Sequence, residues 1–148
     1  MNEQMNTQTS YRETLQRWHG IVRRQQHDGL ADILTEDCVF FSPVVHTPQQ
    51  GRDLTMLYLS GAMHVFNDSF HYTKEIVSPE HAVLEFECTV DGILINGVDI
   101  ISFAGDGRIR EFRVMVRPLK AMQMLHGKMA AMLEQLKSRA QAPDLSRK

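Results

Sequence analysis

Apolar residues recur every three or four positions in several stretches of the chain, which is the spacing of one face of an α-helix. The first stretch is 11–27, which ends before Gly29, and a short helix over 30–34 is expected after it. The same spacing returns over 51–66 and over 119–137, where the apolar side is rich in methionine. These patterns predict an N-terminal helix pair, a third helix and a C-terminal amphipathic helix.

Between 66 and 119 the apolar residues alternate with polar ones, as is typical of β-strands. Three turn sequences divide 70–116 into four strands: Ser78-Pro79-Glu80, Asp91-Gly92 and Ala104-Gly105-Asp106-Gly107. Such turns join antiparallel neighbours, so these strands should form a meander. A further strand is expected at 38–41, ended by Ser42-Pro43, and 44–50 should be a loop.

The two-residue turn at Asp91-Gly92 determines which side chains share a face of the sheet. It pairs Leu84 with Asp99 and puts both on one face. The last turn, taken as a four-residue loop, pairs Phe103 with Arg108. It places three apolar side chains on the face of Asp99: Phe112, Val114 and Val116. Asp99 is therefore the exception on an otherwise apolar face.

The opposite face of the sheet carries apolar residues between charged ones. A tight turn at Pro79-Glu80 sets Lys74 opposite Glu85 on this face. Four apolar residues should lie there as well: Leu94, Val98, Ile100 and Met115. Because large apolar patches are rarely left in water, the pattern predicts a homodimer formed through the outer sheet face.

Composition limits the classes of partner. With 148 residues, 43% of them hydrophobic, the chain suits a single domain, which we place at 11–138 between disordered tails at 1–10 and 139–148. The net charge is −2 and the charged residues of both signs alternate, so nucleic acid is not an expected partner. No segment resembles a signal peptide or a membrane span, and Cys38 and Cys88 lie in apolar runs. These features are typical of a cytoplasmic protein that binds small neutral molecules.

Asp99 is the strongest candidate for a functional group. A carboxyl among apolar side chains must be hydrogen-bonded, paired with a cation or protonated. The alternative is a structural aspartate bonded to a buried tryptophan or hydroxyl. His46, on the loop after Ser42-Pro43, could move a proton near neutral pH, although most loop histidines are merely solvated. No histidine or cysteine spacing indicates a metal, and no glycine motif precedes a helix, so neither a metal nor a cofactor is expected.

The order of the elements resembles the nuclear transport factor two-like superfamily. The resemblance rests on a strand that ends in Ser-Pro, a helix that begins Gly51-Arg52, and Asp-Gly-Arg-Ile at the last turn. Within this superfamily, residues 11–120 are similar to SnoaL-like polyketide cyclases and bacterial ketosteroid isomerases. The resemblance implies an α+β cone, in which a curved antiparallel sheet wraps around the N-terminal helix pair and the third helix.

The isomerase pattern has three catalytic positions, and one of them is retained. Val98-Asp99-Ile100-Ile101-Ser102-Phe103 matches the strand pattern Ile-Asp-x-x-x-Phe. Ser42 stands in place of the general-base aspartate, and Trp18 in place of a tyrosine on the first helix. Serine is a poor base near pH 7, and an indole N–H donates but cannot accept a proton. The resemblance therefore implies acid–base chemistry centred on Asp99, with His46 as an auxiliary group.

Two functions remain open at this point. The first is a cofactor-independent acid–base isomerase, cyclase, lyase or hydrolase that acts on a small apolar carbonyl compound, such as a steroid- or polyketide-like molecule. Its ligand-binding residues would be Trp18, Phe40, Ser42, Leu57, Phe86, Phe112 and Val114. The second is a non-catalytic ligand-binding or protein-assembly module of the same fold.

Overall fold

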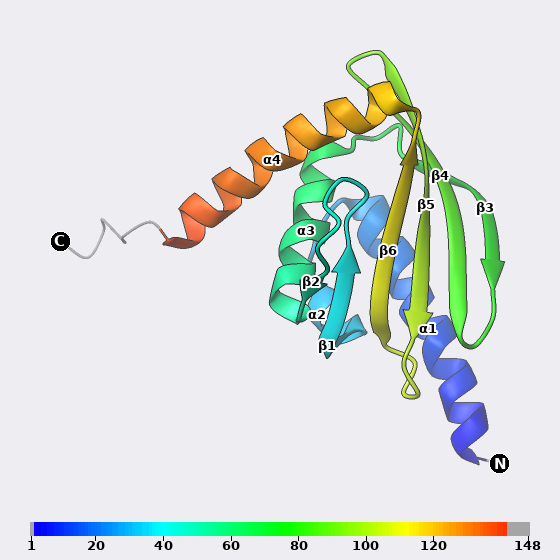
Figure 1. Cartoon of the computed structure of the whole chain (residues 1–148). Helices are drawn as coiled ribbons and strands as arrows, with labels where there is room; N and C mark the ends of the chain where they lie inside the picture. Colours follow the sequence, from blue (N-terminus) through cyan, green and yellow to red (C-terminus); the bar gives the residue numbers. More distant parts are fainter. Residues whose placement is uncertain (1, 142–148) are drawn as a thin grey trace.

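The chain folds around one curved six-stranded sheet, with helices packed on its inner side (Figure 1). The computed structural model describes residues 2–141. In chain order the elements are α1 (Asn2–Arg24), α2 (Leu30–Ile33), β1 (Leu34–Phe41), β2 (Gln49–Gln50), α3 (Arg52–Val65), β3 (His71–Val77), β4 (His81–Val90), β5 (Ile93–Phe103), β6 (Ile109–Arg117) and α4 (Leu119–Gln141). This is the α+β fold class that the sequence predicts.

The two terminal helices are longer than the apolar pattern predicts. The pattern begins at Tyr11, yet α1 starts at Asn2 and so includes positions expected to form a disordered tail at 1–10. Periodicity reveals only the part of a helix that packs on a core, and Tyr11 is buried against Phe103. At the other end α4 continues to Gln141, and the rest of the tail expected at 139–148 lies outside the described residues.

The sheet is mixed, which corrects the expectation of an antiparallel sheet. Its strand order is β2-β1-β6-β5-β4-β3. The four consecutive strands β3 to β6 form the expected meander, but β1 pairs with β6 in parallel. Parallel neighbours need a long crossover connection, and the stretch from α3 through the meander provides one. The short strand β2 adds an antiparallel edge from a segment expected to be loop.

The hairpin between β4 and β5 confirms the register derived from its turn. Leu84 pairs with Asp99 as expected. Between β5 and β6 the register differs, because Phe103 pairs with Ile109 and an adjacent bulge brings Asp99 opposite Val114. The longer loop and the bulge each shift the pairing by one residue. Together they shift the pairing by two residues, which returns each side chain to its original face. The apolar residues of β6 therefore stay on the face of Asp99.

Two apolar clusters fill the space between the sheet and the helices. The larger contains Trp18 and Phe112, and the smaller contains Phe86 and Leu125. Val114, the neighbour of Asp99 across the β5–β6 pair, packs against both clusters, as does Tyr72 of β3. Asp99 is therefore positioned where the two clusters meet.

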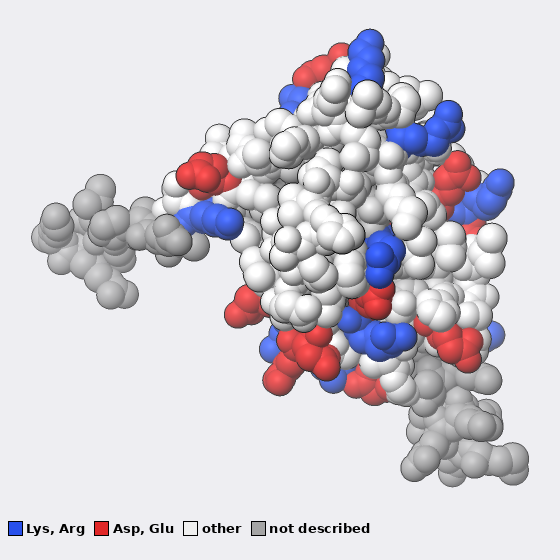
Figure 2. All heavy atoms as spheres, viewed as in Figure 1, with Lys and Arg blue, Asp and Glu red and all other residues white. Residues whose placement is uncertain are grey.

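The outside of the molecule carries charges of both signs. On the face shown in Figure 2, Lys and Arg are interspersed with Asp and Glu, and uncharged surface separates them. Within residues 2–141, none of the helices has the length and apolarity to cross a membrane.

Candidate functional site

A largely apolar pocket of about 320 Å³ lies between the inner face of the sheet and helices α1, α3 and α4. Aromatic rings make up much of its wall: Trp18, Phe40, Tyr58, Phe66, Phe70, Phe86 and Phe112. The exposed side of the lining is contributed by α4, with His126, Glu134 and Lys137. Among the described ionisable side chains that line the pocket, Asp99 is the one that is buried.

The carboxyl of Asp99 is held within this wall by a single side chain. Asp99 is 5% exposed, and its Oδ2 accepts a hydrogen bond of 2.6 Å from the hydroxyl of Tyr72. Burial raises the pKa of Asp99 to about 7, although the hydrogen bond from Tyr72 acts to lower it. Protonated and ionised forms of this carboxyl are therefore both populated near neutral pH.

Tyr72 connects Asp99 to the first helix. Its hydroxyl oxygen accepts a hydrogen bond of 2.9 Å from Nε1 of Trp18. Burial, together with the charge of Asp99, holds the pKa of Tyr72 well above its usual value. Tyr72 therefore stays neutral and acts as a hydrogen-bond donor to the carboxylate. The structural alternative considered from the sequence, an aspartate bonded to a buried tryptophan or hydroxyl, describes part of this arrangement.

Sequence reasoning missed Tyr72 because of a bulge in β3. The turn at Pro79-Glu80 predicts Lys74 opposite Glu85, and this pair is present. Continued without interruption, that register would place Tyr72 opposite Glu87, on the outer face. The register shifts between Tyr72 and Lys74, so Tyr72 pairs with Phe86 on the inner face instead. No local sequence signal marks this bulge.

The lining includes most of the residues that the sequence nominated: Trp18, Phe40, Ser42, Phe86, Asp99, Phe112 and Val114. Two nominated residues are placed elsewhere. Leu57 is half-buried on α3 but does not line the pocket, because the neighbouring Tyr58 and Leu59 occupy the inner side of that helix. The contribution of Leu57 to binding therefore stays a prediction, while its two neighbours are part of the lining.

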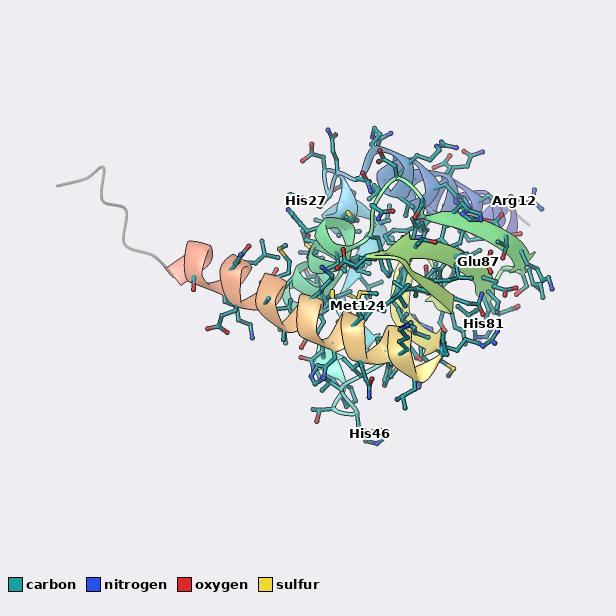
Figure 3. The ribbon with its side chains drawn as sticks, turned by 90° about the horizontal axis from the view of Figure 1, so that it is seen from above. Arg12, His27, His46, His81, Glu87 and Met124 are labelled. Carbon is teal, nitrogen blue, oxygen red and sulfur yellow. The ribbon has the colours of Figure 1, made fainter. Side chains whose placement is uncertain are left out.

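His46 is exposed and also lies outside the pocket. The loop that carries it turns at Ser42, whose Oγ accepts hydrogen bonds from the backbone N–H groups of Val44 (3.2 Å) and Val45 (3.4 Å). Val44 and Val45 line the pocket, while His46 follows them at the outer edge of the molecule (Figure 3). His46 is thus outside the lining of the pocket, and its auxiliary role stays a prediction.

A second, polar groove of about 760 Å³ lies between α1 and β3. Its lining includes His19 and Glu75, whose Nε2 and Oε1 atoms are 2.7 Å apart. No three His, Cys, Asp or Glu side chains among the described residues are grouped so that they could hold a metal ion.

Comparisons with known proteins identify similar chains. Residues 15–112 match the model of the SnoaL-like domain. A steroid delta-isomerase from Pseudomonas aeruginosa is 36% identical, with a TM-score of 0.83 over 87% of this chain and 95% of that chain. An uncharacterized protein with a cystatin-like fold from Silicibacter pomeroyi is 30% identical, with a TM-score of 0.75 over 80% of this chain and 83% of that chain.

A more distant structural match is an epoxide hydrolase/cyclase-like enzyme of pyran ring formation in the polyether salinomycin. It is 15% identical, with a TM-score of 0.60 over 76% of this chain and 94% of that chain. At this level of identity the match shows a shared fold alone. No curated protein has a matching sequence.

Proposed function

Because this chain belongs to the SnoaL-like domain family, we propose that it binds a small apolar, carbonyl-bearing molecule and exchanges a proton with it through Asp99. Family membership also confirms the superfamily resemblance drawn from the sequence. The observation that carries the proposal is a carboxyl, 5% exposed and with its pKa raised to about 7, at the wall of an apolar pocket. The 36% identity to a protein called a steroid delta-isomerase supports a ring-shaped apolar ligand.

A carboxyl with a pKa close to neutral can act in either direction. In its protonated form Asp99 donates a hydrogen bond, or the proton itself, to the carbonyl oxygen of the ligand. In its ionised form it accepts a proton from a carbon next to that carbonyl. Tyr72 remains neutral and stabilises the carboxylate through the hydrogen bond to Oδ2. Asp99 can thus serve as the acid or as the base, according to its protonation state.

The aromatic wall would orient the ligand and keep water away from the carboxyl. Phe40 stacks on Tyr58 with 5.2 Å between ring centroids, and Trp18 contacts Phe112 edge-on at 5.0 Å. Flat apolar rings pack well against such surfaces. A low local polarity also strengthens the interaction between Asp99 and a polarised carbonyl.

The test is proton exchange on an apolar ketone. The wild-type protein should accelerate the exchange of hydrogen for deuterium at the carbons next to the carbonyl of a steroid ketone, measured by NMR. Asp99→Asn should slow this exchange by about 10²- to 10⁴-fold, because the amide cannot accept the proton. Asp28→Asn, in the exposed turn after α1, is the matched control and should leave the rate unchanged. An Asp99→Asn variant that keeps the full rate would refute the assignment.

Ligand binding without turnover is the second candidate, and the position of Ser42 favours it. In the isomerase pattern this position holds the general base, whereas here the hydroxyl oxygen of Ser42 accepts backbone hydrogen bonds within the loop. Trp18 is the only tryptophan of the chain and lines the pocket, so its fluorescence reports occupancy. Quenching of Trp18 by a ketone that undergoes no exchange would favour the binding function.

We further propose that two copies associate through the outer sheet face. Leu94 and Met115 are 54% and 52% exposed on this face. Glu85 and Glu87 lie on β4. On this face β6 carries Arg113 and Arg117 together with Glu111, which pairs with Arg113 at 3.0 Å, so β6 is basic by a single net charge. A two-fold axis along β5 sets the acidic strand of one copy against the basic strand of the other, whereas a perpendicular axis would oppose like charges.

A further inference from the structure

The hydrogen bonds that lead to Asp99 run in one direction. Nε1 of Trp18 donates to the hydroxyl oxygen of Tyr72, and Tyr72 donates to Oδ2 of Asp99. An indole N–H is a donor that cannot accept. The single hydroxyl proton of Tyr72 is therefore directed to Asp99 and cannot be passed on to Trp18. The chain of hydrogen bonds ends at the carboxyl.

The two oxygens of the Asp99 carboxyl consequently differ. Oδ2 is occupied by Tyr72, whereas Oδ1 has no hydrogen-bond partner among the described residues. Among the described residues, Thr35 Oγ1 is the only side-chain nitrogen or oxygen atom that is fully buried and lacks a hydrogen-bond partner. Because Oδ1 of Asp99 also lacks a partner, it cannot be fully buried. Because Asp99 lines the pocket, Oδ1 is the oxygen that a pocket molecule can touch.

Tyr72 also belongs to the wall between the pocket and the polar groove. It lines the groove, while Val22, Gln25 and Phe70 line both spaces. On the groove side His19 meets Tyr72 ring against ring, with 5.4 Å between centroids, and its Nε2 is engaged with Glu75. Among the described residues, no acceptor from the groove reaches the hydroxyl of Tyr72.

We propose that Tyr72 is a positioning residue that is itself oriented by Trp18. Tyr72 holds Oδ2 of Asp99 and prevents proton exchange with the groove, so that Asp99 gives and receives protons at Oδ1. The orientation is a property of the resting protein, and its consequence for turnover rests on the proposed acid–base function. With the pocket filled, a proton taken from one carbon of the ligand stays on Oδ1. It is then returned to another carbon of the same molecule. One C–H bond breaks and one forms, which is the balance of an isomerisation.

Few other titratable groups face this carboxyl. Tyr58 of α3 lines the same pocket, and α4 adds three exposed groups to the lining: His126, Glu134 and Lys137. The pKa of Asp99 is set by burial, which raises it, and by the hydrogen bond from Tyr72, which lowers it. Removal of the Tyr72 hydroxyl therefore acts on Asp99 directly.

The test is the titration of Asp99 in the full chain without ligand, followed by NMR of its carboxyl carbon. Tyr72→Phe should raise the pKa of Asp99 by roughly one unit, because the carboxylate loses its donor. Trp18→Phe should raise it less, since Tyr72 can still donate but is no longer oriented. Tyr58→Phe is the matched control, a pocket tyrosine without a hydrogen bond to Asp99, and should leave the titration unchanged.

A Tyr72→Phe variant that titrates like the wild type would overturn the proposal. If that variant does not fold, the wild type supplies the decisive measurement. The hydroxyl proton of Tyr72 should exchange with water more slowly than that of Tyr58, which has no hydrogen-bond partner among the described residues. Equally fast exchange of the two hydroxyl protons would also overturn it.

These measurements separate the inference from the proposed function. If the titrations behave as expected and no ketone exchanges protons, the positioning role of Tyr72 stands and the enzymatic proposal fails. If Asp99 is required for exchange but Tyr72→Phe leaves its titration unchanged, the enzymatic proposal stands and the positioning role fails.

Discussion

Asp99 shows how burial controls a single ionisable group. Its carboxyl lies between two apolar clusters, where the charged form lacks the solvation that water provides. Tyr72 offers one hydrogen bond, which offsets part of this cost without reversing it. The result is a group that retains a proton at a pH at which an exposed aspartate is ionised. The same property that suits acid–base chemistry should therefore destabilise the folded protein as the pH rises.

We expect the stability of the protein to report this cost. An unfolded aspartate titrates at about 3.9, and the folded protein raises the pKa of Asp99 to about 7. Between these values the folded chain holds a proton that the unfolded chain releases. The free energy of unfolding should therefore fall across this interval, by on the order of 4 kcal/mol. Urea denaturation at several pH values measures it.

Asp99→Asn should abolish this part of the pH dependence. Above about pH 7 its free energy of unfolding should exceed that of the wild type. Asp28→Asn, which removes an exposed carboxyl, should follow the wild-type profile. If the profile of Asp99→Asn ran parallel to that of wild type, the carboxyl would not carry a raised pKa.

Gly97 permits the close packing of a pocket residue. Gly97 pairs with Phe86, and a Cβ at this position would overlap the Phe86 ring and lie 2.7 Å from the carbonyl oxygen of Met115. Gly97→Ala should therefore lower the free energy of unfolding by roughly 1–3 kcal/mol, as measured by urea denaturation. Gly105→Ala, where nothing lies within 4 Å of the added Cβ, is the control and should change stability little. Equal stability of the two variants would contradict the overlap.

At the scale of elements, the packing of α4 on α3 determines how open the pocket is. The helix crosses the end of the sheet and extends beyond it (Figure 1). Its contact with α3 includes Gly61, where an added Cβ would lie 3.3 Å from Met129 and 3.4 Å from Leu133. Both of these α4 residues line the pocket. A small residue on α3 thus brings the adaptable methionine side of α4 close enough to complete the wall.

A larger side chain at Gly61 should separate these helices. In Gly61→Leu the displaced α4 would admit small molecules more easily, so acrylamide should quench the fluorescence of Trp18 more strongly, by roughly two-fold or more. Gly127→Leu places the same side chain on α4 where nothing lies within 4 Å of the added Cβ. Quenching that rises equally in both variants would show that α4 does not cover the pocket at Gly61.

At the scale of the whole molecule, the proposed dimer should be visible by sedimentation. The wild-type protein should have the mass of two chains at micromolar concentration. Met115→Glu should yield monomers, because it places a carboxylate in the apolar contact and opposite the acidic side chains of β4 in the other copy. Leu54→Glu, at an apolar position on α3 that is 36% exposed, should remain dimeric. A monomeric wild-type protein would exclude association through this face.

The inner position of Asp99 could be derived from the sequence because the information is local. The turn at Asp91-Gly92 joins two adjacent strands, so a few residues determine their register. Side chains alternate between the two faces of the sheet, and this alternation then places Asp99 on the inner face. The helices around the pocket follow equally from apolar periodicity. Most of the residues nominated from the sequence line the pocket, chiefly because strand alternation places them on the inner face. The one retained isomerase position pointed to the same carboxyl.

The sequence by itself thus determined the helices in outline, the strands other than β2, the α+β class and the face on which Asp99 lies. Tertiary structure alone decided the parallel pairing of β1 with β6, the inward turn of Tyr72 and the exposure of His46. Periodicity and turns act between neighbours along the chain, whereas bulges, crossovers and loop paths depend on packing against distant segments. Tyr72, Trp18 and Asp99 are far apart in sequence, and only folding brings their hydrogen bonds together.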